Sequence, residues 1–164
     1  MRTVCPYTQL HPLAERALAR FAPDADCVYL GVTSLTAYHG WLCEMWAAGE
    51  GFLLVEHDTE IHATVLPELT ACPEPWCLFP YNGPGAPESD RLLQGALGCT
   101  RFSTALLQAQ PGFMASIPTR NWQRMDCEIL PRLRTLGYEP HVHMPPVLHH
   151  HIYDGLCACG GNHE

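Results

Sequence analysis

The sequence predicts an α/β protein with a single domain, in which helices flank a mostly parallel central sheet. Apolar runs typical of strands alternate with helical spacings through the first third of the chain, which favours parallel strands joined by helical crossovers. The run Phe52–Val55 is continuously apolar, as expected of a strand that is buried and central in its sheet. The length of 164 residues suits one domain with a real core. We place this domain at residues 1–154 and a tail at 155–164.

The first third is predicted to contain three strands and two helices in alternation. The strands are Thr3–Cys5, which ends at Pro6-Tyr7-Thr8, then Cys27–Val32 and Phe52–Val55. The two helices have apolar residues at helical spacing and are followed by Pro or Gly, residues that end helices. They are His11–Phe21 and Thr36–Ala48.

The remaining elements are less regular. A short helix at His62–Leu69 is predicted to be broken by Pro67, and the loop signals of Asn82–Asp90 predict a long loop. Further strands are expected at Trp76–Tyr81 and Leu97–Phe102, further helices at Thr104–Gln110 and Asn121–Leu136, and an edge strand at His141–His151.

Composition narrows the cellular setting and the partners. The chain has nine Arg, no Lys and a net charge of −8, so it lacks the overall basic footprint of a nucleic-acid-binding protein. A nucleic-acid acceptor would need a local patch, which Arg120, Arg124, Arg132 and Arg134 could form. Nine Cys without a signal peptide indicate reduced thiols, and no window is apolar enough to span a membrane. We expect a cytoplasmic protein.

The strongest functional signal is Glu56-His57-Asp58, directly after the strand Phe52–Val55. The carboxyl ends of strands are where open α/β sheets bind ligands. On an extended segment Glu56 and Asp58 would point the same way, so both could face one divalent cation and, through it, a phosphate. The alternative is a polar turn that caps a helix starting near Thr59.

Three other groups of residues are candidates for chemistry. His141, His143, His149, His150 and His151 follow one another near the C-terminus, and imidazole is a common metal ligand. Asp126 lies early in a predicted helix, where it is either a general base or a carboxylate favoured by the helix dipole. Cys157, Cys159 and His163, with Cys72 and Cys77 elsewhere, could bind zinc, or the tail could simply be frayed.

The order of these parts resembles a small glycosyltransferase of the GT-A fold, which is Rossmann-like. Thr3–Thr8 looks like the first strand and its nucleotide-facing loop. The segment from Tyr38-His-Gly-Trp41 through Ala48–Asp58 is similar to the helix, Gly turn and strand that lead into the family's DxD motif, here with Glu56 in place of the first Asp. Val55–Ile61 is also similar to the Glu-Asp-Asp form of lipopolysaccharide-type glycosyltransferases. Trp122 with Asp126, and the late His-rich strand, follow in the family's order.

The resemblance implies a transfer of sugar from a nucleotide-sugar to an acceptor hydroxyl. Asp58 and a tail histidine, His151 first and His149 second, would hold Mn²⁺ or Mg²⁺ against the diphosphate. Glu56 would reach the ribose or metal-bound water, and His57 would lie beside the donor with Pro6, Tyr7 and Thr8. Asp126 would activate the hydroxyl of a glycan, a small molecule or a modified nucleic acid. The Asn82–Asp90 loop would act as a lid.

Two other classes of function stay open at this point. One is a metal-dependent hydrolase or nuclease that uses Asp58, His57 and the tail histidines. The other is a non-catalytic module that binds a metal or a nucleotide.

Overall fold

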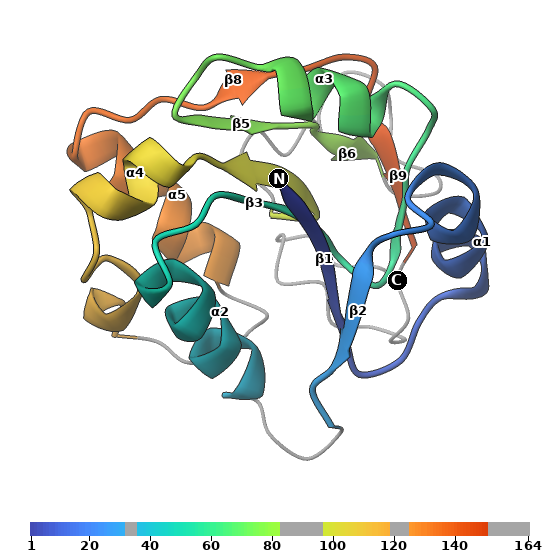
Figure 1. Ribbon diagram of the computed structural model, residues 1–164, viewed down its shortest axis with the longest axis horizontal. Coiled ribbons are helices and arrows are strands. Elements are labelled where there is room, and N and C mark those ends of the chain that lie inside the picture. Colours follow the sequence, from blue (N-terminus) through green and yellow to red (C-terminus); the bar gives the residue numbers. More distant parts are fainter. Residues whose placement is uncertain (32–35, 83–96, 119–124, 151–164) are drawn as a thin grey trace, which may run out of the picture.

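The core of the fold is a six-stranded sheet in the order β2-β1-β3-β7-β5-β8 (Figure 1). The computed structural model describes residues 1–31, 36–82, 97–118 and 125–150. Strand β1 is parallel to β2 and β3, and β5 is parallel to β8, whereas β7 runs antiparallel to both of its neighbours. The strands are β1 Arg2–Tyr7, β2 Asp26–Tyr29, β3 Phe52–Val55, β5 Trp76–Leu78, β7 Cys99–Phe102 and β8 His141–Val142. This confirms the predicted α/β domain with a mostly parallel central sheet.

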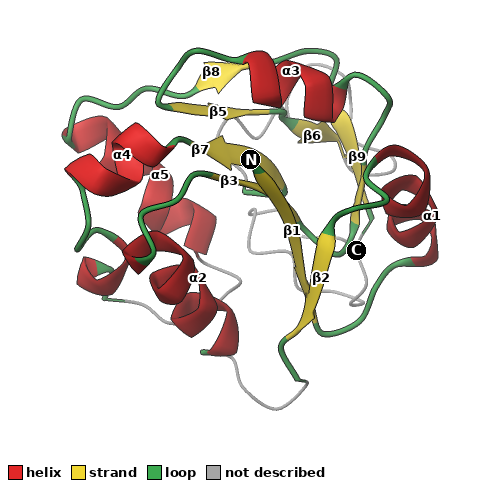
Figure 2. Ribbon diagram, in the orientation of Figure 1, coloured by secondary structure: helices red, strands yellow, loops and turns green. Residues whose placement is uncertain are grey.

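Helices cover both faces of this sheet (Figure 2). Along β3 the side chains alternate: Phe52 and Leu54 pack with α2, α4 and α5, whereas Leu53 and Val55 pack with α1 and α3. The helices are α1 Pro12–Phe21, α2 Ala37–Ala47, α3 Val65–Ala71, α4 Thr104–Ala109 and α5 Met125–Thr135, with a 3₁₀ turn, η1, at Met114–Ser116. The result is a three-layer α/β/α arrangement.

The direction of β7 differs from the prediction, which placed β3 among parallel strands. Strand β3 is central, but it pairs in parallel only with β1, and its other neighbour β7 is antiparallel with Phe52 opposite Phe102. Both strands are fully buried. A strand buried on both faces is apolar whichever way its neighbours run, so composition alone does not encode direction.

A second, three-stranded sheet brings the end of the described chain back to its first half. Its order is β4-β9-β6, from Thr59–Glu60, Val147–His149 and Tyr81–Asn82. The predicted single edge strand at His141–His151 is therefore wrong: β8 and β9 belong to different sheets. The segment between them contains Pro145 and Pro146, which lack the N–H that a sheet ladder needs.

Two prolines behave differently from the predictions. Pro67 does not break a helix, because it lies in the first turn of α3, where backbone N–H groups have no intrahelical acceptor. Pro6 lies inside β1 and pairs with Val28 of β2, so the loop predicted at Pro6-Tyr7-Thr8 starts only after Tyr7. The ladder from β1 to β3 ends at Val4, so Pro6 is paired on one side only.

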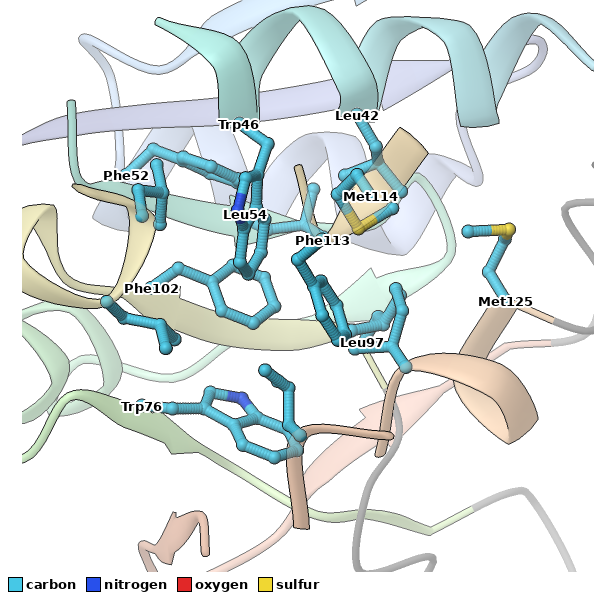
Figure 3. Close-up of a cluster of buried hydrophobic side chains, with 14 of the residues drawn as sticks. Leu42, Trp46, Phe52, Leu54, Trp76, Leu97, Phe102, Phe113, Met114 and Met125 are labelled. Carbon is cyan, nitrogen blue, oxygen red and sulfur yellow. The ribbon is translucent and has the colours of Figure 1, made fainter. Parts of the chain in front are cut away.

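Large aromatic side chains fill the core between the sheet and α2, α4 and α5 (Figure 3). The ring of Trp46 packs edge-on against Phe102 with centroids 5.2 Å apart, and its indole N–H donates to the carbonyl of Gln110 at 2.6 Å. Burial of each such side chain contributes about 1.5–3 kcal/mol. Gly51, just before β3, lies so close to α4 that a Cβ there would be 2.6 Å from the backbone nitrogen of Thr104.

Among the described helices, none is long and apolar enough to cross a membrane.

Candidate functional site

The predicted acidic segment forms a tight turn at the carboxyl end of β3. The backbone N–H of Thr59 donates to the carbonyl of Glu56 at 3.1 Å, which closes the turn, and Thr59 then starts β4. No helix starts at Thr59, so the alternative of a helix-capping turn is wrong. The expectation of an extended segment is also wrong. The turn directs the carboxylates of Glu56 and Asp58 to different partners.

Asp58 is buried against two imidazole rings. Its Oδ2 lies 3.0 Å from Nε2 of His149 in β9 and 3.9 Å from Nε2 of His57. All three residues are less than a tenth exposed. The other carboxylate oxygen of Asp58, Oδ1, is buried and has no hydrogen-bond partner among the described residues. An unpaired buried oxygen costs free energy unless a ligand contacts it.

The protonation states follow from this burial. Burial alone would raise the pKa of Asp58, but the hydrogen bond and positive charge of His149, helped by His57, outweigh it and hold the pKa below its usual value. Burial lowers the pKa of His57; Asp58 opposes this effect, and His149 adds to it. The turn therefore presents an ionised carboxylate beside a His57 ring that favours its neutral form near pH 7.

The end of β1 lies directly beside this turn. The ring of His57 donates a hydrogen bond to the backbone carbonyl of Pro6, and this bond opposes the lowering of the His57 pKa. After Pro6 the strand continues to Tyr7, whose ring packs 5.5 Å from that of Tyr29 in β2. Thr8 follows the strand. The predicted donor segment Pro6-Tyr7-Thr8 is thus adjacent to the acidic turn.

Glu56 is held by a residue to which no local sequence pattern assigns a role at the site. The hydroxyl of Tyr38, in the first turn of α2, donates to Glu56 Oε1 at 2.7 Å. A buried tyrosine needs a partner for its hydroxyl, but 18 residues separate the pair, and no local pattern links them. Tyr38 fixes the direction of the Glu56 carboxylate.

Three contacts tie the C-terminal segment to the turn. The N–H of His150 donates to the carbonyl of Asp58 at 2.8 Å, and its ring lies 2.8 Å from the Glu60 carboxylate. The same ring stacks on that of His11, the N-cap of α1, with centroids 4.4 Å apart. His11 in turn donates its backbone N–H to the carbonyl of His57 at 2.9 Å. These contacts fix β9 so that His149 faces Asp58.

Comparison with solved structures relates this arrangement to known folds. One similar structure is a glycosyltransferase involved in the glycosylation of the major capsid of PBCV-1, with a TM-score of 0.51 and 14% identity over 96% of both chains. Another is A197 from STIV, with a TM-score of 0.52 and 13% identity over 90% of this chain and 83% of that one. The chain has a glycosyltransferase-like fold. Neither protein-family models nor the sequences of curated proteins give a match.

Several other predicted site residues lie in α5 or outside the described part of the chain. Asp126 lies in the first turn of α5, as expected. Arg132 and Arg134 are each paired with a carboxylate, Glu128 and Glu139, which reduces the cationic patch expected there. Outside the described residues lie His151, Cys157, Cys159, His163, Arg120, Arg124 and residues 83–90 of the expected lid.

The acidic turn fits a hard divalent cation. A carboxylate oxygen without a partner and an imidazole nitrogen beside the same carboxylate are donors that Mn²⁺ accepts, and Mg²⁺ accepts the oxygen. Binding there would satisfy Asp58 Oδ1. The Glu60 carboxylate makes its own pair with His150.

Proposed function

We propose that this protein is a glycosyltransferase that moves a sugar from a nucleotide-sugar to an acceptor hydroxyl with the help of a divalent cation at Asp58 and His149. One observation carries the proposal: the ionised, buried Asp58 meets His149 at the carboxyl end of β3, in a fold shared with a glycosyltransferase. That end of the strand is where α/β sheets bind ligands.

Asp58 and His149 supply the cation-binding groups in this proposal. A bound Mn²⁺ or Mg²⁺ stabilises negative charge on the departing diphosphate. Asp58 would contribute Oδ1, which has no other partner among the described residues. His149 would contribute Nε2 in its unprotonated form, in place of the present hydrogen bond between this nitrogen and Asp58 Oδ2. His151, the first choice from the sequence, lies outside the described residues, so His149 becomes the candidate that the geometry supports.

The donor nucleotide would bind over the ends of β1 and β3. Thr8 follows β1, and Glu56 follows β3 with its carboxylate fixed by Tyr38. A carboxylate fixed in this way is suited to accept hydrogen bonds from ribose hydroxyls. His57 lies between the two strand ends and holds the backbone of Pro6. Together these groups would orient the nucleotide before the transfer.

Asp126 of α5 is the proposed general base for the acceptor hydroxyl. The net charge of −8 and the pairing of Arg132 and Arg134 favour a glycan or a small molecule over a nucleic acid as the acceptor.

Thermal shifts with a panel of sugar nucleotides, each with and without Mn²⁺, test the proposal. At 100 times its dissociation constant, a ligand that binds only the native state stabilises it by about 2.7 kcal/mol. We expect one class of sugar nucleotide to raise the melting temperature only with Mn²⁺. This cation-dependent rise should vanish in Asp58→Asn and be weaker in His149→Gln.

Glu60→Gln is the matched control, because it alters a neighbouring carboxylate–imidazole pair of the same small sheet. It should keep the full shift. A panel with no shift from any sugar nucleotide, or release of product from a phosphoester without a sugar donor, would overturn the glycosyltransferase proposal. The second outcome would favour a metal-dependent hydrolase instead.

A further inference from the structure

A second cluster of metal-binding side chains lies away from the acidic turn. Cys72 directly follows α3, Cys77 is the middle residue of β5, and His143 directly follows β8. One donor atom from each of the three lies within 4.8 Å of the other two. The two thiols are buried, and the histidine is half-buried. We propose that Cys72, Cys77 and His143 form a zinc site.

The spacing of the donor atoms suits this ion. Zn²⁺ binds cysteine sulfur at about 2.3 Å and histidine nitrogen at about 2.0–2.1 Å in tetrahedral geometry, which places ligand atoms about 3.5–3.8 Å apart. The three donors need to approach one another by at most about 1.3 Å to meet that geometry. Water, or His141, whose ring lies 4.6 Å from that of His143, would take the fourth position.

The two ring nitrogens of His143 have different surroundings. Its Nδ1 lies 3.3 Å from the Glu68 carboxylate, and its Nε2 is buried without a hydrogen-bond partner among the described residues. Zinc-binding histidines usually hold a carboxylate with one ring nitrogen and the metal with the other. The ring is also fixed from the side by Phe79, which stacks on it with centroids 5.1 Å apart.

The positive charge of Arg101 lies beside the thiol cluster and favours thiolates there. Arg101 is buried and hydrogen-bonds Cys77, and within the described ranges no carboxylate forms an ion pair with it. Burial, together with the interaction of its thiol with Cys72, raises the pKa of Cys77 to about 12, although Arg101 opposes this rise. Without metal the Cys77 thiol is therefore protonated. Zinc would displace the thiol proton, and the thiolates would then compensate the buried guanidinium.

The site would also have a structural effect. It would link the connection between α3 and β5 to the segment after β8, where only two residues of β8 pair with β5. That segment continues directly into β9, which carries His149. The proposed zinc site does not depend on the proposed glycosyl transfer.

Cobalt titration of the reduced, metal-free full chain tests the proposal. We expect one equivalent of Co²⁺ to produce the near-ultraviolet absorption of a cobalt–thiolate bond, and one equivalent of Zn²⁺ to abolish it. Cys72→Ser and Cys77→Ala should remove the absorption. Cys27→Ala, which removes an exposed thiol of β2, and the double variant Cys157→Ser/Cys159→Ser should leave it unchanged.

Cys77 is fully buried, so its variant risks misfolding, and Glu68→Gln at the more exposed carboxylate provides an independent test. We expect it to weaken Zn²⁺ affinity by roughly 10–100-fold while the absorption persists at saturation. The proposal is overturned if Co²⁺ gives no thiolate absorption, if the tail variant alone removes it, or if Glu68→Gln and His143→Gln both bind Zn²⁺ as the unaltered chain does.

Discussion

The acidic turn, Glu56–Asp58 with His149, and the thiol cluster, Cys72 and Cys77 with His143, have the same construction but different ligand atoms. Each joins side chains from the first half of the chain to a histidine of the C-terminal segment, His149 in one and His143 in the other. The acidic turn offers carboxylate oxygen, which suits hard cations such as Mn²⁺ and Mg²⁺. The thiol cluster offers sulfur, which suits Zn²⁺.

The two regions also differ in charge before any ion binds. The pKa of Asp58 is held below its usual value, so its carboxylate is ionised, whereas the pKa of Cys77 is raised to about 12 and its thiol is protonated. A cation can bind the acidic turn without displacing protons from the carboxylate, but at the thiol cluster it must displace them. The proposed site at the acidic turn is therefore suited to an exchangeable ion, and the proposed site at the thiol cluster to a permanent one.

The largest expected effect is that of Asp58→Asn, which removes the charged ligand of one site only. We expect it to lower the Mn²⁺-dependent affinity for the sugar nucleotide by more than about 100-fold, since loss of an outer-shell partner alone costs roughly 10–100-fold. Cobalt–thiolate absorption should be unchanged. Calorimetric titration measures the affinity for the sugar nucleotide, and cobalt spectra of the same sample measure the thiolate absorption. Loss of both signals together would contradict the independence of the two sites.

Gly51→Ala tests whether a defect of the core can imitate a defect of either site. The added Cβ would meet backbone atoms, 2.6 Å from the Thr104 nitrogen and 2.9 Å from the Phe102 oxygen. We expect a loss of about 1–3 kcal/mol of stability in urea denaturation. In conditions where the variant is folded, the affinities of both sites should be unchanged.

Gly40→Ala is the matched control for that substitution. Gly40 lies in α2, and a Cβ there meets nothing within 4 Å. Alanine should raise stability by about 0.5–1 kcal/mol, because glycine is a poor helix former. Equal losses in both variants would contradict the close packing of Gly51.

The pH dependence of stability separates the two regions further. Burial lowers the pKa of His57 below 6.5, so between that value and the folded pKa the unfolded chain binds more protons. The contribution of neutral His57 to the free energy of unfolding is therefore complete above pH 6.5. It is lost as the pH falls through the pKa of His57 in the folded protein. In the presence of a chelator, acidification from about pH 7.5 to 5 should lower the free energy of unfolding of the unaltered chain. We expect this decrease to be smaller in His57→Gln.

His143→Gln makes the corresponding change in the thiol cluster. Burial and His141 lower the pKa of His143, although Glu68 opposes them, so its contribution has the same sign as that of His57. If the two histidines act independently, their effects on the pH slope should add in the double variant. An unchanged slope in either single variant would contradict the assigned pKa direction for that residue.

The smallest effect is expected at the neighbour of the acidic turn. Glu60 and His150 form an ion pair at 2.8 Å, but the Glu60 side chain is 34% exposed. Because exposed pairs are weak, Glu60→Gln should cost less than about 1 kcal/mol in urea denaturation. A loss as large as that in Gly51→Ala would show that this pair, too, is essential to the small sheet.

The sequence was sufficient for features that depend on local burial or spacing. The apolar run of β3 located the acidic turn at a strand end, and helical spacing located α1, α2 and α4 close to their observed bounds. Local patterns did not reveal the direction of β7 or the role of Tyr38. Both depend on partners distant in sequence, 18 residues away in the case of Tyr38 and Glu56.

The histidine-rich segment shows the same limit. Its composition indicated metal ligands, but not that the prolines between β8 and β9 would send its histidines to two different places. His143 and His149 therefore belong to different clusters, although only five residues lie between them. Which histidine meets which partner is set by tertiary packing.

The position of β9 has a consequence for how the protein is made. Glu60 and His150, which pair across the small sheet, are 90 residues apart. During translation the acidic turn is therefore synthesised long before β9, the strand that covers it. Until β9 is inserted between β4 and β6, Asp58 lacks the imidazole that compensates its burial. A nascent chain that ends before Val147 holds the carboxylate without its partner, so the two parts of the proposed cation site meet only after β9 has been synthesised.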